Sequence, residues 1–397
     1  MTSSAMRIGY CTNVHAGADL ETTRANLQQH AVGVKQQFSP DVPLGVGLWL
    51  SAEAARKLRA TDHMEEFGAW LAEAGLAPFT LNGFPYGDFH QPVVKHEVYK
   101  PTWSEQARAD YTLDLIEILA ALLPSGADGS ISTLPLQWGT PAPHAEQLSA
   151  AAANLRSVAD RLAQLEVESG RLIHVCLEPE PGCAMDRAED VVRFFENYLL
   201  ADGDEATIRR HIRVCHDVCH SAVMFEEQAD AFRKLKSAGI HVGKIQVSSA
   251  VILPFNEITP EQRVEALNQL RSFAEDRYLH QTVVRSSPLA EPVFFEDLPI
   301  ALNTVENADE LTGEWRVHFH VPIYLERFGL LQTSQKQILE CLETVDREMP
   351  TLSHFEVETY AWGVLPDELR QTRLSDGIAK ELRWFSDVAS QIKMDGV

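Results

Sequence analysis

The segment Arg213-Val214-Cys215-His216-Asp217-Val218-Cys219-His220 begins as a short buried strand and ends in side chains that bind metal ions. Because side chains alternate along a strand, Cys215 and Asp217 are expected on the same face. A carboxylate at the end of such a strand, followed three residues later by His220, indicates a divalent-metal site. The alternative is a structural aspartate that caps the next helix, a common role for this residue.

Strand-like and helix-like stretches alternate along nearly the whole chain, a pattern that predicts a parallel sheet. Eight of the expected strands are residues 6–13, 43–50, 78–84, 130–138, 172–180, 212–217, 242–249 and 352–359. This rhythm predicts an α/β fold, a (β/α)8 TIM barrel with its site at the C-terminal ends of the strands. A doubly wound sheet is the alternative. It usually has a glycine-rich phosphate turn after the first strand, and none is present here.

Two further strand-like runs, residues 278–285 and 315–321, exceed the eight strands of a barrel. We therefore expect an inserted strand pair near residues 278–320. The whole chain, residues 1–397, is expected to form a single barrel domain, because strand–helix alternation continues on both sides of this insertion.

The bulk properties limit the classes of function. The 397 residues carry a net charge of −23 with a pI near 5.0, which argues against nucleic acid and anionic membrane surfaces as partners. Six cysteines without a CxxC pair predict neither a disulfide framework nor a zinc cluster. Residues 1–6 lack the pattern of a secretory leader, and no apolar run is long enough for membrane insertion. We expect a cytoplasmic protein that acts on a small molecule and is compatible with a homo-oligomer.

Several expected strands have one apolar face and one polar face. Residues Ile173, Val175 and Leu177 alternate with His174, Cys176, Glu178 and Glu180, and the same parity places Arg316, His318 and His320 together in the run 315–321. Burying so many ionisable groups without a function is costly, although internal salt bridges are an alternative. The predicted metal ligands are Glu178, Asp217, Gln246 and Glu356. Glu180 and Glu358 lie two residues further along the same faces and compete for this role.

Several motifs together resemble the xylose-isomerase-like TIM barrels, which include sugar isomerases, ketose 3-epimerases and endonuclease IV. These motifs are Leu177-Glu178-Pro179, Asp217-x-x-His220, a polar residue in the seventh strand and a late Glu-x-Glu. A narrower resemblance, to the Ebo-type metabolite-traffic family, covers almost the whole chain and is carried by residues 9–15, 82–86, 318–322 and 354–366. It implies the barrel and a role in making or moving a small secondary metabolite.

The superfamily resemblance also implies roles for individual residues. Glu178 and Glu356 match glutamates that bind metal and act as bases, Asp217 matches an aspartate ligand, and His220 matches a histidine near the substrate. Gln246 stands where the superfamily usually has a histidine ligand, and His318 or His320 is the candidate replacement. The cofactor expected is one divalent metal, Mn²⁺, Mg²⁺ or Zn²⁺.

The expected function is metal-dependent isomerisation or epimerisation of a small polyhydroxylated metabolite, with Glu178 and Glu356 exchanging a proton on opposite sides of it. A carrier that binds the metabolite without converting it is the alternative, while an endonuclease is disfavoured by the net charge. Arg285 is a candidate clamp for an anionic group. The expected substrate-binding residues are Asn13, His15, Asn82, Lys100, Arg285, His318, His320 and Glu358.

Overall fold

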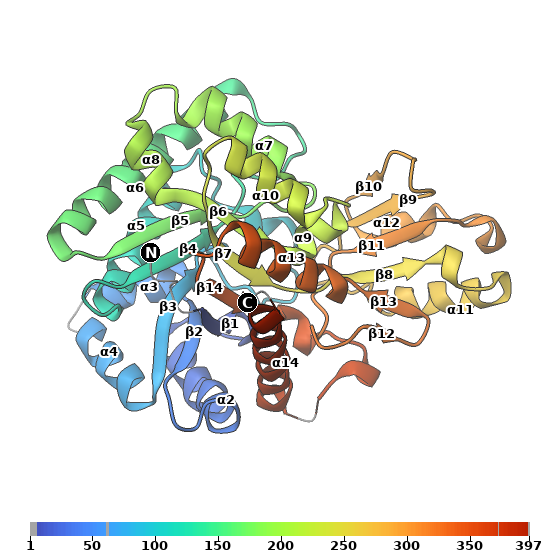
Figure 1. The fold of residues 1–397 in the computed structure, drawn as a ribbon, viewed down its shortest axis with the longest axis horizontal. Coiled ribbons are helices and arrows are strands. Elements are labelled where there is room, and N and C mark those ends of the chain that lie inside the picture. Colours follow the sequence, from blue (N-terminus) through green and yellow to red (C-terminus); the bar gives the residue numbers. More distant parts are fainter. Residues whose placement is uncertain (1–5, 61–62, 372, 396–397) are drawn as a thin grey trace.

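The computed structural model describes residues 6–60, 63–371 and 373–395. Residues 1–5, which belong to the segment without a leader pattern, lie outside the described residues. Eight parallel strands close into a barrel in the order β1-β14-β7-β6-β5-β4-β3-β2, and helices surround it (Figure 1). The strands are β1 (Arg7–Cys11), β2 (Leu44–Trp49), β3 (Leu76–Asn82), β4 (Asp128–Thr133), β5 (Leu172–Leu177), β6 (Ile212–Asp217), β7 (Val242–Val247) and β14 (His354–Val357). The predicted (β/α)8 barrel is confirmed, and the doubly wound alternative is excluded.

The barrel strands are joined by helices whose apolar faces pack on the outside of the barrel. These are α1 (Leu20–Asn26), α2 (Val32–Phe38), α3 (Ala52–Arg59), α4 (His63–Glu73), α5 (Gln106–Leu122), α6 (Ala145–Ser169), α7 (Ala188–Phe194), α8 (Glu205–His211), α9 (Val218–Val223), α10 (Gln228–Ser237), α13 (Gln335–Glu348) and α14 (Leu374–Asp395). Ser51 caps α3 by accepting a hydrogen bond from the Ala54 N–H. The single long helix expected after Ser51 is two helices, α3 and α4.

Short 3₁₀ and π turns connect or interrupt these elements. They are η1 (Thr12–Val14), η2 (Leu27–Ala31), η3 (Lys95–Tyr99), η4 (Phe195–Leu199), η5 (Phe255–Glu257), η6 (Ala308–Glu310), η7 (Tyr360–Gly363) and η8 (Asp367–Leu369). The stretch expected to extend the fourth strand to Trp138 leaves the sheet after Thr133, where Pro135 cannot donate a ladder hydrogen bond.

The insertion is larger than the strand pair expected near residues 278–320. It is a six-stranded antiparallel sheet in the order β10-β9-β11-β8-β13-β12, which lies to one side of the barrel (Figure 1). Its strands are β8 (Val251–Pro254), β9 (Thr282–Arg285), β10 (Val293–Phe295), β11 (Glu314–Val317), β12 (Arg327–Phe328) and β13 (Leu331–Thr333), with α11 (Pro260–Arg271) and α12 (Leu298–Asn303) between them. All six strands have four residues or fewer, and the sequence pattern revealed only β9 and β11, which lie within the two longer strand-like runs 278–285 and 315–321.

The insertion is tied to the barrel directly above the strand ends. The Val321 N–H donates to the Ser249 carbonyl at 3.0 Å, and the Ser334 N–H donates to the Ala250 carbonyl at 3.0 Å. One continuous hydrophobic core contains Phe355 of the barrel together with Trp315 of the insertion. The segment after β11 therefore has a fixed position over the mouth of the barrel. Within the described part of the chain, none of the helices combines the length and apolar character needed to cross a membrane.

We propose that the chain unfolds as one domain, because barrel and insertion share one core. Calorimetry of the metal-free protein is expected to show one transition whose calorimetric and van't Hoff enthalpies agree. Two resolved transitions, or a calorimetric enthalpy well above the van't Hoff value, would contradict a single cooperative unit.

Candidate metal centre and cavity

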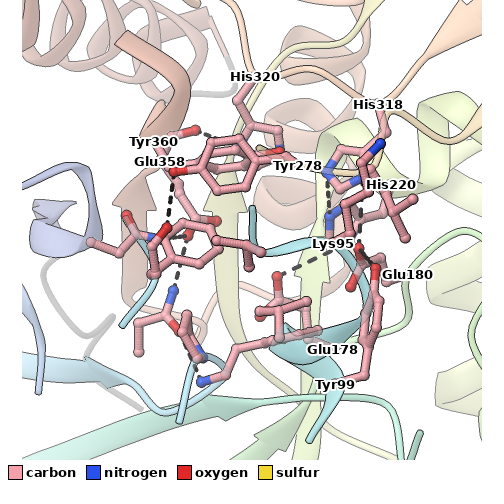
Figure 2. Close-up of a pocket in the computed structure, with 18 residues that line it drawn as sticks. Lys95, Tyr99, Glu178, Glu180, His220, Tyr278, His318, His320, Glu358 and Tyr360 are labelled. Atoms are coloured by element: carbon pink, nitrogen blue, oxygen red, sulfur yellow. Dashed lines mark hydrogen bonds and ion pairs between the residues drawn. The ribbon is translucent and has the colours of Figure 1, made fainter. Parts of the chain in front are cut away.

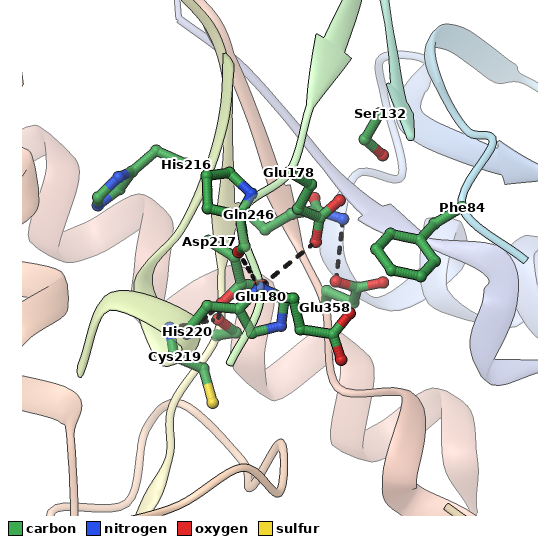
Figure 3. Close-up of polar contacts among 12 residues, drawn as sticks. Phe84, Ser132, Glu178, Glu180, His216, Asp217, Cys219, His220, Gln246 and Glu358 are labelled. Atoms are coloured by element: carbon green, nitrogen blue, oxygen red, sulfur yellow. Dashed lines mark hydrogen bonds and ion pairs between the residues drawn. The ribbon is translucent and has the colours of Figure 1, made fainter. Parts of the chain in front are cut away.

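Three carboxylates from different strands converge at the C-terminal mouth of the barrel. Glu178 follows β5, Asp217 ends β6 and Glu358 follows β14. Each offers one oxygen, and these oxygens all lie within 4.8 Å of one another (Figure 3 shows the three side chains). All three side chains are buried, with at most 4% of each residue exposed. Such a concentration of negative charge away from water is unfavourable unless positive charge is supplied.

Asp217 combines the two roles that its sequence allows. Its Oδ1 accepts hydrogen bonds from the His220 N–H at 2.9 Å and from the Ser248 hydroxyl at 2.7 Å, so it caps α9. Its Oδ2 is buried and has no hydrogen-bond partner among the described residues. That oxygen lies 3.8 Å from Nε2 of His320. One oxygen therefore holds the helix while the other faces the cluster.

Three histidines present the same ring nitrogen to this cluster. Nδ1 of His220 donates to the Pro179 carbonyl at 2.8 Å, and Nδ1 of His320 donates to the Glu358 carbonyl at 2.8 Å. The roles of these nitrogens follow from the partners, because a carbonyl only accepts. Nε2 of each ring is left to face the site. Histidine ligands of metals are held in this way, with the other ring N–H on a carbonyl or carboxylate.

His318 completes this set from the loop after β11. Gln281 donates through Nε2 to Glu180 at 2.9 Å, so its Oε1 accepts from Nδ1 of His318 at 2.7 Å. Nε2 of His318 then lies 3.2 Å from Nε2 of His220, close enough for the two rings to share a proton. Burial and the neighbouring His220 hold the pKa of His318 well below its usual value.

The buried atoms that have no hydrogen-bond partner test whether a metal fits. Oε2 of Glu178, Oδ2 of Asp217 and Nε2 of His320 are all buried without a partner in the described part of the chain. Asp217, His220 and His320 form a second group with ligand atoms within 4.8 Å, as do Glu180, His220 and His318. Oxygen and imidazole donors in this combination suit Mn²⁺, Zn²⁺, Co²⁺ or Fe²⁺. The residues present therefore fit a divalent metal.

The pKa shifts agree with a missing positive charge. Burial, then the charges of Glu358 and Asp217, raises the pKa of the Glu178 carboxyl well above its usual value. Burial, then Asp217 and Glu356, raises the pKa of Glu358 to about 8. Burial also raises the pKa of Asp217, but the nearby His220 and His320 outweigh it and leave that pKa below its usual value. A bound cation would favour the ionised form of every one of these groups.

Three side-chain amides hold Glu358 in place. Asn13 and Asn82 donate to Oε1 at 2.7 Å and 2.9 Å, and Gln246 donates to Oε2 at 2.9 Å. Gln246 was expected as a metal ligand. Its amide nitrogen orients Glu358, while its Oε1 is buried without a partner in the described residues. Asn13 and Asn82, expected at the substrate, line the cavity and act on Glu358 (Figure 2).

Glu356, expected as a ligand and base, occupies a different position. Its Oε2 lies 2.5 Å from Nζ of Lys244, and both side chains are completely buried. Glu356 is not among the residues that line the cavity or form the ligand groups of the described chain. Strand parity put Glu356 and Glu358 on the same inward face, but only the residue closer to the strand end reaches the site.

The cavity lies between the carboxylates, the histidines and an aromatic wall (Figure 2). Its volume is about 60 Å³. The lining residues are Asn13, Asn82, Phe84, Pro85, Phe89, Val94, Lys95, Val98, Tyr99, Glu178, Glu180, His220, Tyr278, Leu279, His318, His320, Glu358 and Tyr360. Glu178, Glu180, His220, His318, His320 and Glu358 were expected from the sequence.

Three of the expected substrate-binding residues, His15, Lys100 and Arg285, lie outside this cavity. His15 is buried, with Nε2 3.0 Å from the Tyr10 hydroxyl, and its ring stacks on His30. Lys100 pairs with Glu97 at 2.7 Å. Arg285 lies over the ring of Phe225 at 4.0 Å and does not line the cavity, so its role as an anion clamp stays a prediction. Arg316 lies over the same ring and donates to the Ala222 carbonyl, because β11 belongs to the inserted sheet and not to the barrel.

Sequence reasoning missed the aromatic wall. Tyr99 donates to Glu180 at 2.8 Å, and Tyr278 and Tyr360 line the cavity beside it. The long polar and aromatic loop after the third strand, residues 85–101, was the available signal, since long loops in compact domains are usually functional. Gln281 had no such signal, because its role depends on a contact across the insertion.

Comparison with solved structures supports the fold. A crystal structure of a xylose isomerase-like TIM barrel protein from Mycobacterium smegmatis in complex with magnesium is 10% identical, with a TM-score of 0.54 and 99% of each chain covered. The probable 3-DHS dehydratase AsbF of Bacillus anthracis is 12% identical, covering 96% of this chain and 99% of its own, with a TM-score of 0.47. The IOLI protein with a bound zinc atom is 10% identical, covering 98% and 99%, with a TM-score of 0.46.

No protein-family model matches the sequence. No curated protein matches it either. At these identities the likeness to the Mycobacterium smegmatis protein extends to the fold alone, a xylose-isomerase-like barrel, as the superfamily resemblance implied. The narrower resemblance to the Ebo-type family stays a prediction.

Proposed function

We propose that this protein is a metal-dependent enzyme that isomerises or epimerises a small polyhydroxylated metabolite, within a pathway that makes or moves a secondary metabolite. The observation that carries the proposal is the convergence of unpartnered ligand atoms from Glu178, Asp217 and His320 beside a cavity. A purely structural cluster of carboxylates would be expected to have its oxygens satisfied by hydrogen bonds or paired cations.

Asp217 belongs to two ligand groups, one with Glu178 and Glu358 and one with His220 and His320, and these residues would hold the metal. When bound, a divalent cation polarises a substrate carbonyl and makes the proton on the neighbouring carbon more acidic. Asn13, Asn82 and Gln246 keep Glu358 in one orientation through their amides. The aromatic wall excludes water from the same space, which strengthens each electrostatic contact in it.

Proton transfer is assigned to the side of the cavity that faces away from Glu358. Glu180 lines the cavity, and burial raises the pKa of its carboxyl group. It takes the role first expected for Glu356, which is paired with Lys244. The His220 and His318 rings are close enough to share a proton and can return it to the substrate. A carboxylate base and an imidazole acid on one cavity wall are a suitable pair for moving a proton between adjacent carbons.

A carrier that binds the metabolite without converting it is the second candidate. The amide cage around Glu358 favours it, because both oxygens of that carboxylate already accept hydrogen bonds and are poorly placed to accept a proton. The two candidates differ in whether a bound ketone exchanges its α-proton with solvent.

The first prediction concerns metal content. Purified protein is expected to hold about one divalent ion per chain, and its removal by a chelator should lower the melting temperature by mass action. Elemental analysis and thermal denaturation measure the two effects. Absence of metal, together with no thermal shift on adding Mn²⁺, Mg²⁺ or Zn²⁺, would remove the proposed centre.

Asp217 separates the metal role from the capping role. Asp217→Asn keeps an oxygen for the His220 N–H and the Ser248 hydroxyl but removes one negative charge. Its metal affinity should fall about tenfold or more, while the metal-free protein melts at the same temperature or higher. Asp217→Ala also removes the cap and should destabilise the metal-free protein by about 1 kcal/mol. An Asn variant that loses as much metal-free stability as the Ala variant would contradict the metal role.

Glu180→Gln tests the enzyme against the carrier. The substitution keeps the size of the side chain and removes the base, while the proposed ligands stay in place. Exchange of the α-proton of a bound ketose or keto-cyclitol with D₂O, followed by NMR, should slow by a factor on the order of 10². Metal content should not change, and the exposed control Glu368→Gln should retain full exchange. If the unmodified protein binds such a ketone but never exchanges the proton, the carrier is correct.

A further inference from the structure

The cavity has two chemically different halves. Carboxylates and histidines form one part of its lining, and apolar and aromatic residues from the loop after β3 and from the insertion form the other part. The apolar side comprises Phe84, Phe89, Val94, Val98, Tyr278 and Leu279. A bare sugar or cyclitol can place only the C–H face of its ring on such a wall, whereas an apolar ring-sized group would cover more of it.

Two tyrosines of this wall, Tyr99 and Tyr278, offer ring faces and not hydroxyl groups. The Tyr99 hydroxyl donates to Glu180 at 2.8 Å, and the Tyr278 hydroxyl donates to the Phe89 carbonyl at 3.1 Å. Phe89 in turn packs against Tyr278, with ring centroids 4.9 Å apart. Because these two hydroxyls already have partners inside the protein, their rings act toward a ligand as apolar surface.

Positive charge available to an anionic ligand is absent from the described lining of the cavity. Lys95 is the only lysine or arginine among those residues, and its Nζ lies 2.5 Å from Oδ2 of Asp297. Lys100, further out, pairs with Glu97. The opposite wall contributes Glu178, Glu180 and Glu358. A phosphate or carboxylate would enter a negative field with no free cationic side chain to bind it.

A second hollow extends the apolar wall outward. It has a volume of about 400 Å³ and shares Pro85, Phe89, Val94 and Val98 with the inner cavity. The inner space therefore suits the polar end of a ligand, and the shared wall suits a larger body beside it.

We propose that this site takes an uncharged amphiphilic molecule, with a vicinal diol or hydroxy-ketone at one end and an apolar ring-sized body at the other, and that it disfavours phosphorylated or carboxylated sugars. The position of the polar end rests on the proposed function, because it places that end at the metal ligands. The apolar body and the absence of charge rest on the walls of the cavity alone.

Three probes that share a skeleton test this proposal: propane-1,2-diol, 3-phenylpropane-1,2-diol and 3-phenyllactate. Their dissociation constants are measured by ligand-observed NMR on the full chain, both metal-free and loaded with Mg²⁺. The phenyl diol should bind about tenfold or more tighter than propanediol, because the wall buries its ring. In the metal-free form, phenyllactate should bind roughly tenfold more weakly than the phenyl diol, because its carboxylate meets like charge. With Mg²⁺ bound the carboxylate would also meet the cation, so the comparison of these two probes is made on the metal-free protein.

A charge-gain variant gives a matched control. Val98→Lys puts an ammonium group on the shared wall, whereas Val93→Lys puts one on the same loop at a residue that is 55% exposed and outside the cavity. Val98→Lys should strengthen phenyllactate binding, and Val93→Lys should leave it unchanged. The two variants therefore separate charge in the cavity from charge on the protein surface. The probe comparison on the unmodified protein does not depend on either variant folding.

Each outcome decides between the proposals. Equal binding of the two diols, no detectable binding of the phenyl diol at millimolar concentration, or phenyllactate binding the metal-free protein as tightly as the phenyl diol would overturn the amphiphile proposal. With Mn²⁺ in place of Mg²⁺, the diol protons should relax faster than the ring protons. If no metal binds but the phenyl diol is still preferred, the proposed function fails while the class of ligand stands.

Discussion

The burial of like charges at one end of the barrel is the constraint on which the rest of the site depends. Glu178, Asp217 and Glu358 bring three ligand oxygens within 4.8 Å of one another in a space closed to water. Hydrogen bonds reduce this repulsion at two of the residues. Three side-chain amides donate to Glu358, and the His220 N–H at the start of α9 donates to one oxygen of Asp217. Glu178 has no comparable relief at Oε2. A divalent cation bound here, as proposed, would balance this negative charge.

The inserted sheet is part of the site and not a decoration on the barrel. It supplies His318 and His320 from the loop after β11, and Tyr278 from the segment before β9. The barrel supplies the acceptors that orient these rings, since the carbonyl of Glu358 fixes His320. An imidazole from outside the eight strands thus stands beside the carboxylates, while Gln246 of β7 orients one of them. Loss of contact between the sheet and the barrel would remove His318, His320 and Tyr278 from the site together.

The sequence predicted the barrel because eight stretches alternate with helices, and it predicted the polar interior because strand parity is strict. Strand parity does not tell, however, how deep inside the barrel an inward-facing residue lies. Glu356 and Glu358 share a face, and only the three-dimensional stagger of the strands separates a residue paired with Lys244 from one that reaches the cavity. Most strands of the insertion were not predicted for a different reason, since strands as short as β12 and β13 have too few residues to show an alternating pattern. Arg285 and Arg316 looked available as charges, but both lie against Phe225.

The ion pair between Lys244 and Glu356 shows why the depth of a residue inside the barrel matters for function. Lys244 and Glu356 are both completely buried, and their opposite charges cancel within the barrel. Removing either partner would leave a buried charge without compensation, a change that typically costs about 3–5 kcal/mol. The layer above differs in kind, because there the ion-pair partners of Glu178 and Asp217 among the described residues are histidines, and several buried atoms have no hydrogen-bond partner in the same part of the chain. Ion pairing thus stabilises the interior of the barrel, whereas the unbalanced charge is confined to the layer that meets the cavity, where a ligand can reach it.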